Sequence, residues 1–170
     1  MRRAVIVGSF DPFTVGHHDM VERTLGIFDQ VVIGVVGDNV NKPGLSPASE
    51  RVAAIRRVYA DEQRVTVATY HGLAVDFCLE QGGCCLVKGV RSVRDYEYEL
   101  EQADINRSLT QGRVETLLLP ARPCLAHVSS SMVRELRHFG RDVTPWTEII
   151  PERRNGGTTE SDTLPHCHKS

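Results

Sequence analysis

The sequence has few lysines and no long apolar run. Only three of its 20 basic residues are lysine (Lys42, Lys88 and Lys169), and 22 acidic residues bring the net charge to −2. A protein that coats nucleic acid carries an excess of basic residues, so this balance argues against such a partner. No stretch approaches the ~20 apolar residues of a membrane span. The run 4–8 after the first arginines is too short for a signal peptide. We therefore expect a cytoplasmic protein with no nucleic-acid or membrane partner.

Cysteine is scarce as well. The 170 residues include five cysteines, far below the density of small domains that are held together by disulfides. The remaining composition, 41% hydrophobic and 25% charged, is that of a globular protein. A chain of this length can bury one sizeable core. These numbers exclude disorder of the whole chain and predict about one domain.

Short apolar runs alternate with helical patterns along the chain. The runs expected to form buried strands are 4–8, 31–36, 64–68, 84–87 and 114–119. The helical patterns cover about 17–28, 47–60, 73–81, 95–110 and 129–139. This alternation predicts a single-domain α/β fold, a Rossmann-like, doubly wound, five-stranded parallel sheet with helices on both faces. In such sheets ligands bind at the carboxyl ends of the strands, where the strand order reverses.

The end of the chain has a different composition. Residues 153–170 contain few apolar side chains and many glycine, proline, serine and threonine residues, so we expect a disordered tail there. The tail includes His166, Cys167 and His168. These side chains could bind a soft metal, but three consecutive ligands lack the spacing of a structural zinc site. A passive tail is the favoured interpretation.

The segment that follows the first expected strand contains residues suited to phosphate binding. It reads Gly8-Ser-Phe-Asp-Pro-Phe-Thr-Val-Gly-His17. Glycine allows the backbone to approach a ligand closely. Thr14 and His17 fall at the start of the next helix, where unpaired N–H groups and the helix dipole favour an anion. Asp11 either accepts hydrogen bonds that fix the loop or simply forms a turn before Pro12.

This segment resembles the signature of the nucleotidyltransferase superfamily that is marked by (His/Thr)-x-Gly-His. Within that superfamily, residues 3–151 resemble the bacterial phosphopantetheine adenylyltransferase family. The other matching motifs are Asn41-Lys42, Glu50-Arg51, Gly72-Leu73, Lys88-Gly-Val-Arg91, Asp95-Tyr-Glu-Tyr-Glu-Leu100 and Val128-Ser-Ser-Ser131. The resemblance implies that a catalytic domain, 1–152, reversibly transfers AMP from ATP to 4′-phosphopantetheine. The products are dephospho-coenzyme A and pyrophosphate, and the step belongs to coenzyme A biosynthesis.

The resemblance implies four catalytic residues, Thr14, His17, Lys42 and Arg91. Thr14 and His17 would contact the α-phosphate of ATP, with His17 as the main group that stabilises the transition state. Lys42 would reach the nucleophilic phosphate and the α-phosphate together. Arg91 would bind the β- or γ-phosphate. No covalent enzyme intermediate is needed, so catalysis would depend on positioning and charge.

The resemblance also implies which residues bind each substrate. Those expected to bind 4′-phosphopantetheine are Ser9, Lys42, Leu73, Ala74 and Lys88. Those expected to bind ATP are Ser9, Phe10, His17, Gly89, Val90, Arg91, Glu99, Leu125, Ala126, His127, Val128, Ser129, Ser130 and Ser131. Serine is also a common helix N-cap. The three serines could therefore cap the helix, bind phosphate, or do both.

Three positions depart from the family pattern. Lys88 replaces the commoner arginine, which exchanges a planar fork of donors for a point charge. Leu45-Ser46 stand where the family usually has an aromatic or Met-Phe pair. Leu125-Ala126-His127 replace an aromatic-Ser-Phe run. We expect this last change to alter nucleotide affinity more than the reaction itself.

The sequence shows no carboxylate cluster with metal-ligand spacing, so Mg²⁺ is expected to arrive with ATP, held by phosphates and water. The resemblance implies a homohexamer and coenzyme A as a feedback inhibitor. Two other functions remain as alternatives. One is a transferase of the same superfamily that acts on nicotinate mononucleotide or a phosphorylated alcohol. The other is a non-catalytic sensor of nucleotide or coenzyme A.

Overall fold

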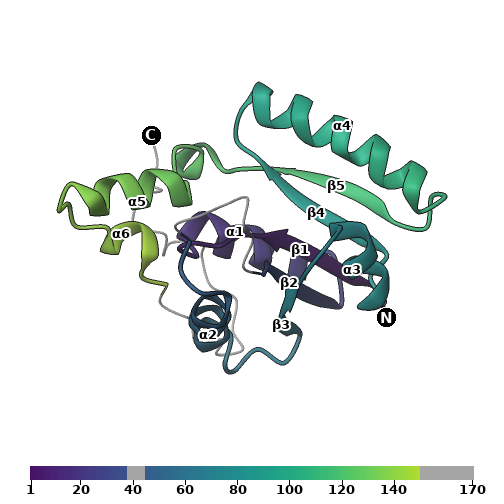
Figure 1. The fold of residues 1–170 in the computed structure, drawn as a ribbon, viewed down its shortest axis with the longest axis horizontal. Coiled ribbons are helices and arrows are strands. Elements are labelled where there is room, and N and C mark those ends of the chain that lie inside the picture. The colour runs from purple at the N-terminus through teal and green to yellow at the C-terminus, as the bar shows by residue number, and fades with distance from the viewer. Residues whose placement is uncertain (38–44, 150–170) are drawn as a thin grey trace.

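The computed structural model describes residues 1–37 and 45–149, drawn in colour in Figure 1. The strands are β1 (Arg3–Gly8), β2 (Gln30–Val36), β3 (Val65–Tyr70), β4 (Cys85–Val90) and β5 (Glu115–Pro120). The helices are α1 (Val15–Leu25), α2 (Ala48–Val58), α3 (Ala74–Glu80), α4 (Val93–Leu109), α5 (Ser130–His138) and α6 (Thr144–Thr147), with a 3-10 turn η1 (Pro123–Leu125). Lys42 and the expected tail 153–170, with His166, Cys167 and His168, lie outside the described residues.

The five strands form one parallel sheet in the order β3-β2-β1-β4-β5. The chain moves outward in one direction from β1 to β3, then crosses to β4 and moves outward in the other direction. The order therefore reverses between β1 and β4, which confirms the predicted doubly wound sheet. The carboxyl ends of these two neighbouring strands mark the place where a ligand would bind.

The sheet has a core on each side because successive side chains of a strand point to opposite faces, and a third, smaller cluster joins Val15, Leu125 and Val128. Ala4 and Ile6 of β1 pack with α1 and α2 on one face, whereas Val5 packs with α3 on the other. Cys78 and Cys85 belong to these cores, and burial raises the pKa of their thiols to about 12 and about 11. These two cysteines pack as small apolar residues, whereas Cys84 is exposed.

Several strand and helix limits differ from expectation by one to three residues, and two of these differences bear on the site. β4 continues to Val90, three residues past its apolar run, because Lys88, Gly89 and Val90 stay paired with β5. α1 begins at Val15, two residues early, because Thr14 caps it. The short α6 and η1 were not expected. Among the described helices, none is long and apolar enough to cross a lipid bilayer.

Arginine side chains link the ends of these elements to backbone carbonyls. Arg23 of α1 donates to the carbonyl of Pro120 at 2.7 Å, and Arg56 of α2 donates to that of Val67 at 2.8 Å. The other arginines with such bonds are Arg3 to Gln81, Arg51 to Ser9, Val36 and Ser46, Arg91 to Val128, Arg113 to Thr110, and Arg134 to Asp11. A guanidinium has five N–H donors in a rigid fork, which allows one side chain to hold several carbonyls.

Candidate functional site

The segment after β1 turns into α1 through a capping box. The Thr14 hydroxyl accepts from the backbone N–H of His17 at 3.4 Å, and the Thr14 N–H donates to Nδ1 of His17 at 3.0 Å. Both bonds satisfy donors that a helix start leaves unpaired. They also fix the imidazole at the end of β1, beside the point where the strand order reverses.

The capping box determines which nitrogen of His17 carries the proton. Nδ1 accepts from the Thr14 N–H, so in the neutral ring the proton is on Nε2. Burial, and then the positive charge of Arg91, lower the pKa of His17 from 6.5 to about 4. At neutral pH the ligand-free site therefore presents an uncharged imidazole whose Nε2–H is the donor.

Aromatic rings surround His17. Phe13 stacks on the imidazole with ring centroids 5.4 Å apart, and Phe10 meets it edge-on at 5.1 Å. The far side of Phe13 meets Tyr59 at 6.1 Å, and the Tyr59 hydroxyl lies 2.8 Å from Nδ1 of His18. Phe10 and Phe13 are almost fully buried. These rings fix the orientation of His17 and remove water from one side of it.

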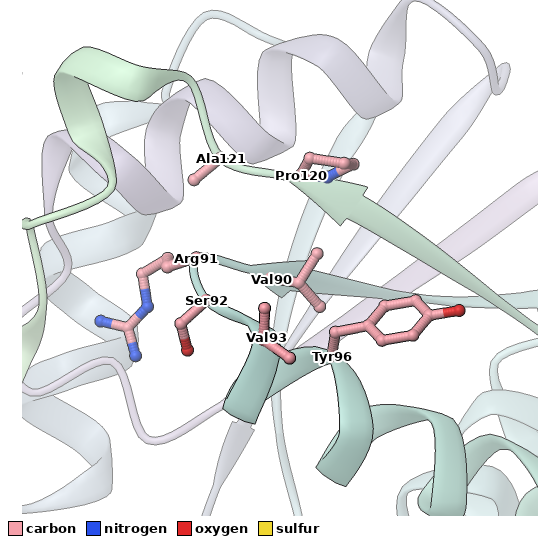
Figure 2. Close-up of a pocket in the computed structure, with 7 residues that line it drawn as sticks. All are labelled: Val90, Arg91, Ser92, Val93, Tyr96, Pro120 and Ala121. Carbon is pink, nitrogen blue, oxygen red and sulfur yellow. The ribbon is translucent and has the colours of Figure 1, made fainter.

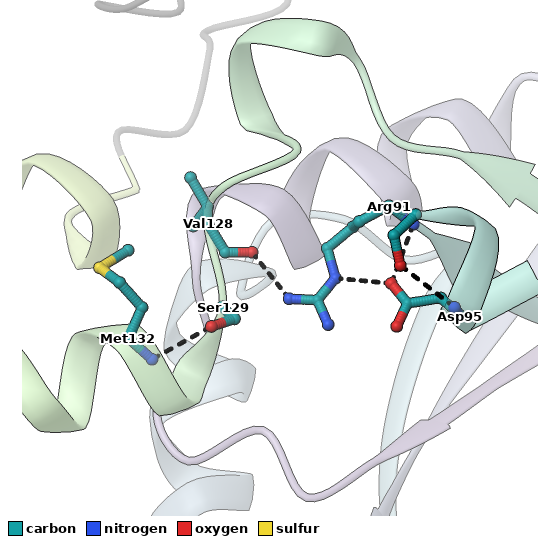
Figure 3. Close-up of polar contacts among 6 residues, drawn as sticks. Arg91, Asp95, Val128, Ser129 and Met132 are labelled. Carbon is teal, nitrogen blue, oxygen red and sulfur yellow. Dashed lines mark hydrogen bonds and ion pairs between the residues drawn. The ribbon is translucent and has the colours of Figure 1, made fainter.

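Arg91 follows β4 and lies between two parts of the chain, as Figure 3 shows. Its Nε is 3.3 Å from Oδ2 of Asp95, and Nη1 donates to the Val128 carbonyl at 3.4 Å. The Arg91 backbone N–H also donates to Asp95 at 3.1 Å. Asp95 is therefore an orienting partner of Arg91.

The start of α5 contacts the segment after β1. Ser129 caps the helix, since its hydroxyl accepts from the Met132 N–H at 3.1 Å (Figure 3). Ser130 donates to the Pro12 carbonyl at 2.8 Å. Gly16 faces Val128, where an added Cβ would lie 3.9 Å from the valine side chain. The structure therefore brings the segment 9–17, Arg91 and the serines of α5 into one cluster.

Asp11 is a buried acceptor in this cluster. Its carboxylate accepts from the Ser46 N–H at 2.9 Å, and its carbonyl accepts from Arg134. Arg134 also donates to the Ser131 hydroxyl at 3.2 Å. Of the two interpretations left open by the sequence, the acceptor that fixes the loop is the one observed.

The remaining predicted residues lie around the cluster. Lys88 pairs with Glu99 of α4, with Nζ 3.1 Å from Oε2, and both side chains are mostly buried. Gly89 and Val90 complete β4. Leu125 is buried against Val15 and Val128, Ala126 ends η1, and His127 is exposed. Leu73 and Ala74 begin α3 beyond the carboxyl end of β3, two strands from β1, and no described contact joins them to the cluster.

A pocket of about 420 Å³ opens beside Arg91, between the ends of β4 and β5 and the first turn of α4 (Figure 2). Its lining is largely apolar, and the Tyr96 ring forms one wall. The lining residues are Val90, Arg91, Ser92, Val93, Tyr96, Pro120 and Ala121. Sequence reasoning assigned no role to Tyr96, Pro120 or Ala121. The only available signal was their position next to the ends of β4 and the edge strand β5.

The described residues contain no group of three His, Cys, Asp or Glu side chains that could hold a metal ion. The cations in and around the cluster are instead Arg91 and Lys88, each beside a carboxylate, and Arg134, which donates to the Asp11 carbonyl. The donors of this site are therefore N–H and O–H groups, a set that binds oxyanions such as phosphates.

Residues 5–136 match the cytidylyltransferase-like family. Among curated relatives, a phosphopantetheine adenylyltransferase of Phocaeicola vulgatus is 47% identical over 152 residues, which covers 89% of this chain and 97% of the relative. The Porphyromonas gingivalis enzyme of that name is 48% identical over 149 residues, covering 88% and 94%. The Streptomyces coelicolor enzyme is 45% identical over 143 residues, covering 84% and 88%.

Solved structures with much lower sequence identity share the fold. A putative nicotinate-nucleotide adenylyltransferase of Vibrio parahaemolyticus superposes with a TM-score of 0.63 at 18% identity, over 88% of each chain. A lipopolysaccharide core biosynthesis protein of Thermoplasma volcanium gives 0.52 at 19% identity, over 72% of this chain and 97% of that one. The family match and the relatives at 45–48% identity lead to one conclusion. The chain belongs to the cytidylyltransferase-like family and, within it, to the phosphopantetheine adenylyltransferases.

Proposed function

We propose that this chain reversibly transfers AMP from ATP to 4′-phosphopantetheine and releases dephospho-coenzyme A and pyrophosphate. Membership of the family supports this reaction, and one structural observation gives it the strongest support. That observation is the neutral His17 ring, held with Nε2–H as the donor and next to Arg91, where the strand order reverses. A fixed donor beside a fixed cation is what phosphoryl-group transfer requires of a protein.

The chemistry balances without a covalent enzyme intermediate. A phosphate oxygen of 4′-phosphopantetheine attacks the α-phosphorus of ATP and forms a new P–O bond. The bond between the α-phosphorus and the bridging oxygen to the β-phosphorus breaks, and pyrophosphate leaves with that electron pair. No proton has to be exchanged when the acceptor phosphate enters as a dianion. The protein has only to align the two phosphates and stabilise the charge between them.

We assign the α-phosphate to His17 and Thr14. His17 donates from Nε2 to a non-bridging oxygen, and its Nδ1 stays occupied by the Thr14 N–H. An imidazole that is already neutral and oriented needs no reorganisation when charge develops on that oxygen. Lys42 completes the expected catalytic set as a cation that reaches both phosphates, although it lies outside the described residues.

Arg91, Ser129, Ser130 and Ser131 are the groups we assign to the β- and γ-phosphates. The support is that Arg91 donates to the Val128 carbonyl at 3.4 Å, next to the α5 N-terminus, where helix N–H groups favour anions. Gly89, Val90, Glu99 and the segment 125–128 remain the expected surroundings of ATP. The pocket beside Arg91 has apolar walls and one aromatic ring, which suit a flat base.

Lys88 is the group we assign to the phosphate of 4′-phosphopantetheine. Its ammonium has three donors, so it can hold Glu99 and still donate to a substrate phosphate. Ser9 would share that phosphate, and Leu73 with Ala74 would contact the pantetheine arm. Leu73 is 53% exposed at the start of α3, which leaves its apolar surface available to a ligand.

Magnesium enters this proposal as part of the substrate, MgATP, because the described residues offer no carboxylate cage of their own. Coenzyme A contains both the pantetheine arm and an adenosine, so we propose that it competes for the same site as a feedback inhibitor. A cytoplasmic location is part of the same proposal, because both substrates are soluble metabolites.

We also propose that the chain assembles with copies of itself through α4. None of the 17 residues of α4 is fully buried. Its exposed apolar side chains are Val93, Tyr96, Tyr98, Leu100, Ile105 and Leu109, each at least 43% exposed. Exposed apolar side chains gathered on one helix mark an interaction surface. A homohexamer is the assembly that the family resemblance implies.

The decisive assay measures pyrophosphate release from MgATP with and without 4′-phosphopantetheine, and with nicotinate mononucleotide as a competing acceptor. We expect release only with 4′-phosphopantetheine. Release with the mononucleotide would assign a different acceptor. ATP binding in calorimetry without release from any acceptor would favour a nucleotide sensor.

A further inference from the structure

The Glu50-Arg51 pair was noted in the sequence but received no role in the site. Arg51 lies in the first turn of α2 and is 3% exposed. Its Nε donates to the Ser46 carbonyl at 2.8 Å. Its Nη1 donates to the Ser9 carbonyl at 2.7 Å and to the Val36 carbonyl at 3.0 Å. One buried guanidinium thus holds the segment after β1, the end of β2 and the segment before α2.

The bond to Ser9 fixes the direction of the next amide. In a trans peptide the C=O and the following N–H are coplanar and point in opposite directions, and the Ser9–Phe10 peptide is trans. When the Ser9 carbonyl points at Arg51, the Phe10 N–H must therefore point away from it. The second carbonyl shows the same geometry, because Val36 accepts from Arg51 while the Gly37 N–H donates the other way, to Tyr70, at 2.8 Å.

The backbone of Phe10 is held in an uncommon conformation. Its φ is +49°, in the left-handed region that non-glycine residues seldom adopt. Its side chain is 3% exposed, and the ring lies against Gly8, where an added Cβ would come within 3.0 Å. Within 1–37 and 45–149, the Phe10 N–H donates no hydrogen bond. A donor fixed in direction and left without a protein acceptor suits an anionic ligand.

The charge of Arg51 acts in the same direction. Charges interact more strongly inside a protein than in water, and this guanidinium contacts the carbonyl of the peptide whose N–H points away from it. The carbonyl dipole is thereby aligned so that the positive end of the peptide, its N–H, faces outward. A buried cation behind an outward-facing N–H favours negative charge in front of that N–H.

We propose that Arg51 is a positioning residue for AMP transfer. It orients the Ser9–Phe10 peptide so that the amide of Phe10, a residue that the family resemblance already assigns to ATP, donates a hydrogen bond to a phosphate oxygen of bound ATP. This inference rests on the proposed function for the identity of the ligand. It adds a residue that never touches substrate yet determines where one of the donors points.

The test compares two arginines of the same helix. Arg51→Met and Arg56→Met both remove a guanidinium and keep an unbranched stem, but Arg56 donates to Val67 in β3, away from the cluster. We expect Arg51→Met to lower kcat by about 10² fold, the effect of losing one preorganised donor, and Arg56→Met to leave kcat within about twofold. Arg51→Lys, which keeps a charge and a donor, should recover part of kcat. A folded Arg51→Met with unchanged kcat would overturn the proposal.

A second measurement does not depend on the folding of a variant. The chain has five phenylalanines, so ¹⁵N-phenylalanine labelling gives five backbone amide signals, with Phe139 on the exposed end of α5 as a reference. ATP should move the Phe10 signal downfield in the unmodified protein and leave Phe139 in place. In Arg51→Met this shift should be lost. An unmodified protein whose Phe10 signal ignores saturating ATP would refute the inference, while pyrophosphate release in the same preparation tests the proposed function separately.

Discussion

The tautomer of His17 is set by the backbone of its own helix. The Thr14 N–H at 3.0 Å reserves Nδ1, so Nε2 is the only ring nitrogen that can donate. Phe10 and Phe13 hold the ring in place. The histidine is thus prepared as a hydrogen-bond donor before ATP binds, and it is not arranged as a general base for the attacking phosphate.

Substitutions of His17 should separate the contribution of its hydrogen-bond donor to kcat from the contribution of its ring. His17→Ala should fold and lose about 10² fold or more in kcat, because it removes a donor to the transferring phosphate. His17→Gln can place an amide N–H near the former Nε2 and should retain more of kcat than His17→Ala. Steady-state kinetics on both variants, with circular dichroism to verify folding, gives the comparison. Near-normal turnover by His17→Ala would remove His17 from the mechanism.

The pKa of His17 makes a prediction about stability. The unfolded chain takes up this proton near pH 6.5, whereas the folded, ligand-free protein takes it up near pH 4. Between these values the unfolded state binds more protons, so stability should fall as the pH falls from about 6.5 to 4 and be fully present above 6.5. Urea unfolding of the unmodified protein and of His17→Gln at pH 4.5, 5.5 and 7.5 measures this. As the pH falls, the unmodified protein should lose more unfolding free energy than His17→Gln does. If the difference between the two proteins is the same at all three pH values, the assignment of the lowered pKa to His17 is wrong.

At the scale of an element, the start of α5 combines two tasks. Ser129 accepts from the Met132 N–H, and Ser130 ties the helix to the segment after β1 through the Pro12 carbonyl. The helix is therefore anchored where its N–H groups face the proposed triphosphate position. Capping and phosphate binding, the two roles left open by the sequence, are compatible at this helix end.

Two substitutions at Ser129 distinguish these roles. Ser129→Ala removes the cap and should cost about 1 kcal/mol of stability, together with a higher KM for ATP. Ser129→Asp restores a cap acceptor but places a negative charge beside the phosphates. It should recover stability and raise the KM for ATP further. Thermal unfolding and ATP kinetics on both variants provide the readouts. An aspartate variant with the KM of the unmodified protein would restrict Ser129 to capping.

The strands were predicted from the sequence more completely than the contacts between elements. The five apolar runs predicted all five strands and the two-sided core, because burial on both faces demands apolar residues. The end of β4 was missed because Lys88 and Gly89 are held in the strand by backbone pairing with β5. Backbone pairing does not require apolar side chains, so the hydropathy pattern does not reveal it. Arg51 and Tyr59 were missed for a related reason. Their partners are backbone carbonyls and a ring 46 positions away, contacts that exist only after folding.

At the scale of the whole molecule, α4 packs on the sheet without fully burying any of its own residues. It lies along β4 and the edge strand β5, as Figure 1 shows, and its apolar side chains remain exposed. The Lys88–Glu99 pair is one of its ties to the sheet. Because Lys88 is also proposed to bind the phosphate of 4′-phosphopantetheine, contacts between chains through α4 would affect substrate binding.

Charged substitutions on α4 test the proposed assembly. Tyr98→Glu and Ile105→Glu place a carboxylate on side chains that are 60% and 51% exposed, so the fold of one chain should tolerate them. We expect light scattering to show a smaller particle than the unmodified protein gives. Arg94→Glu, at an exposed position near the start of α4, controls for added charge. An unmodified protein that runs at 18.9 kDa, the mass of one chain, would refute the assembly.

The arginine contacts to backbone carbonyls have a practical consequence. The frame around the site is held by guanidinium groups, which reagents that acylate primary amines do not attack. The amines of the chain are those of its three lysines and its N-terminus. Amine-directed tagging therefore spares the frame and reaches the proposed site through Lys42 and Lys88, so the protection of these two lysines by added substrate reports occupancy directly.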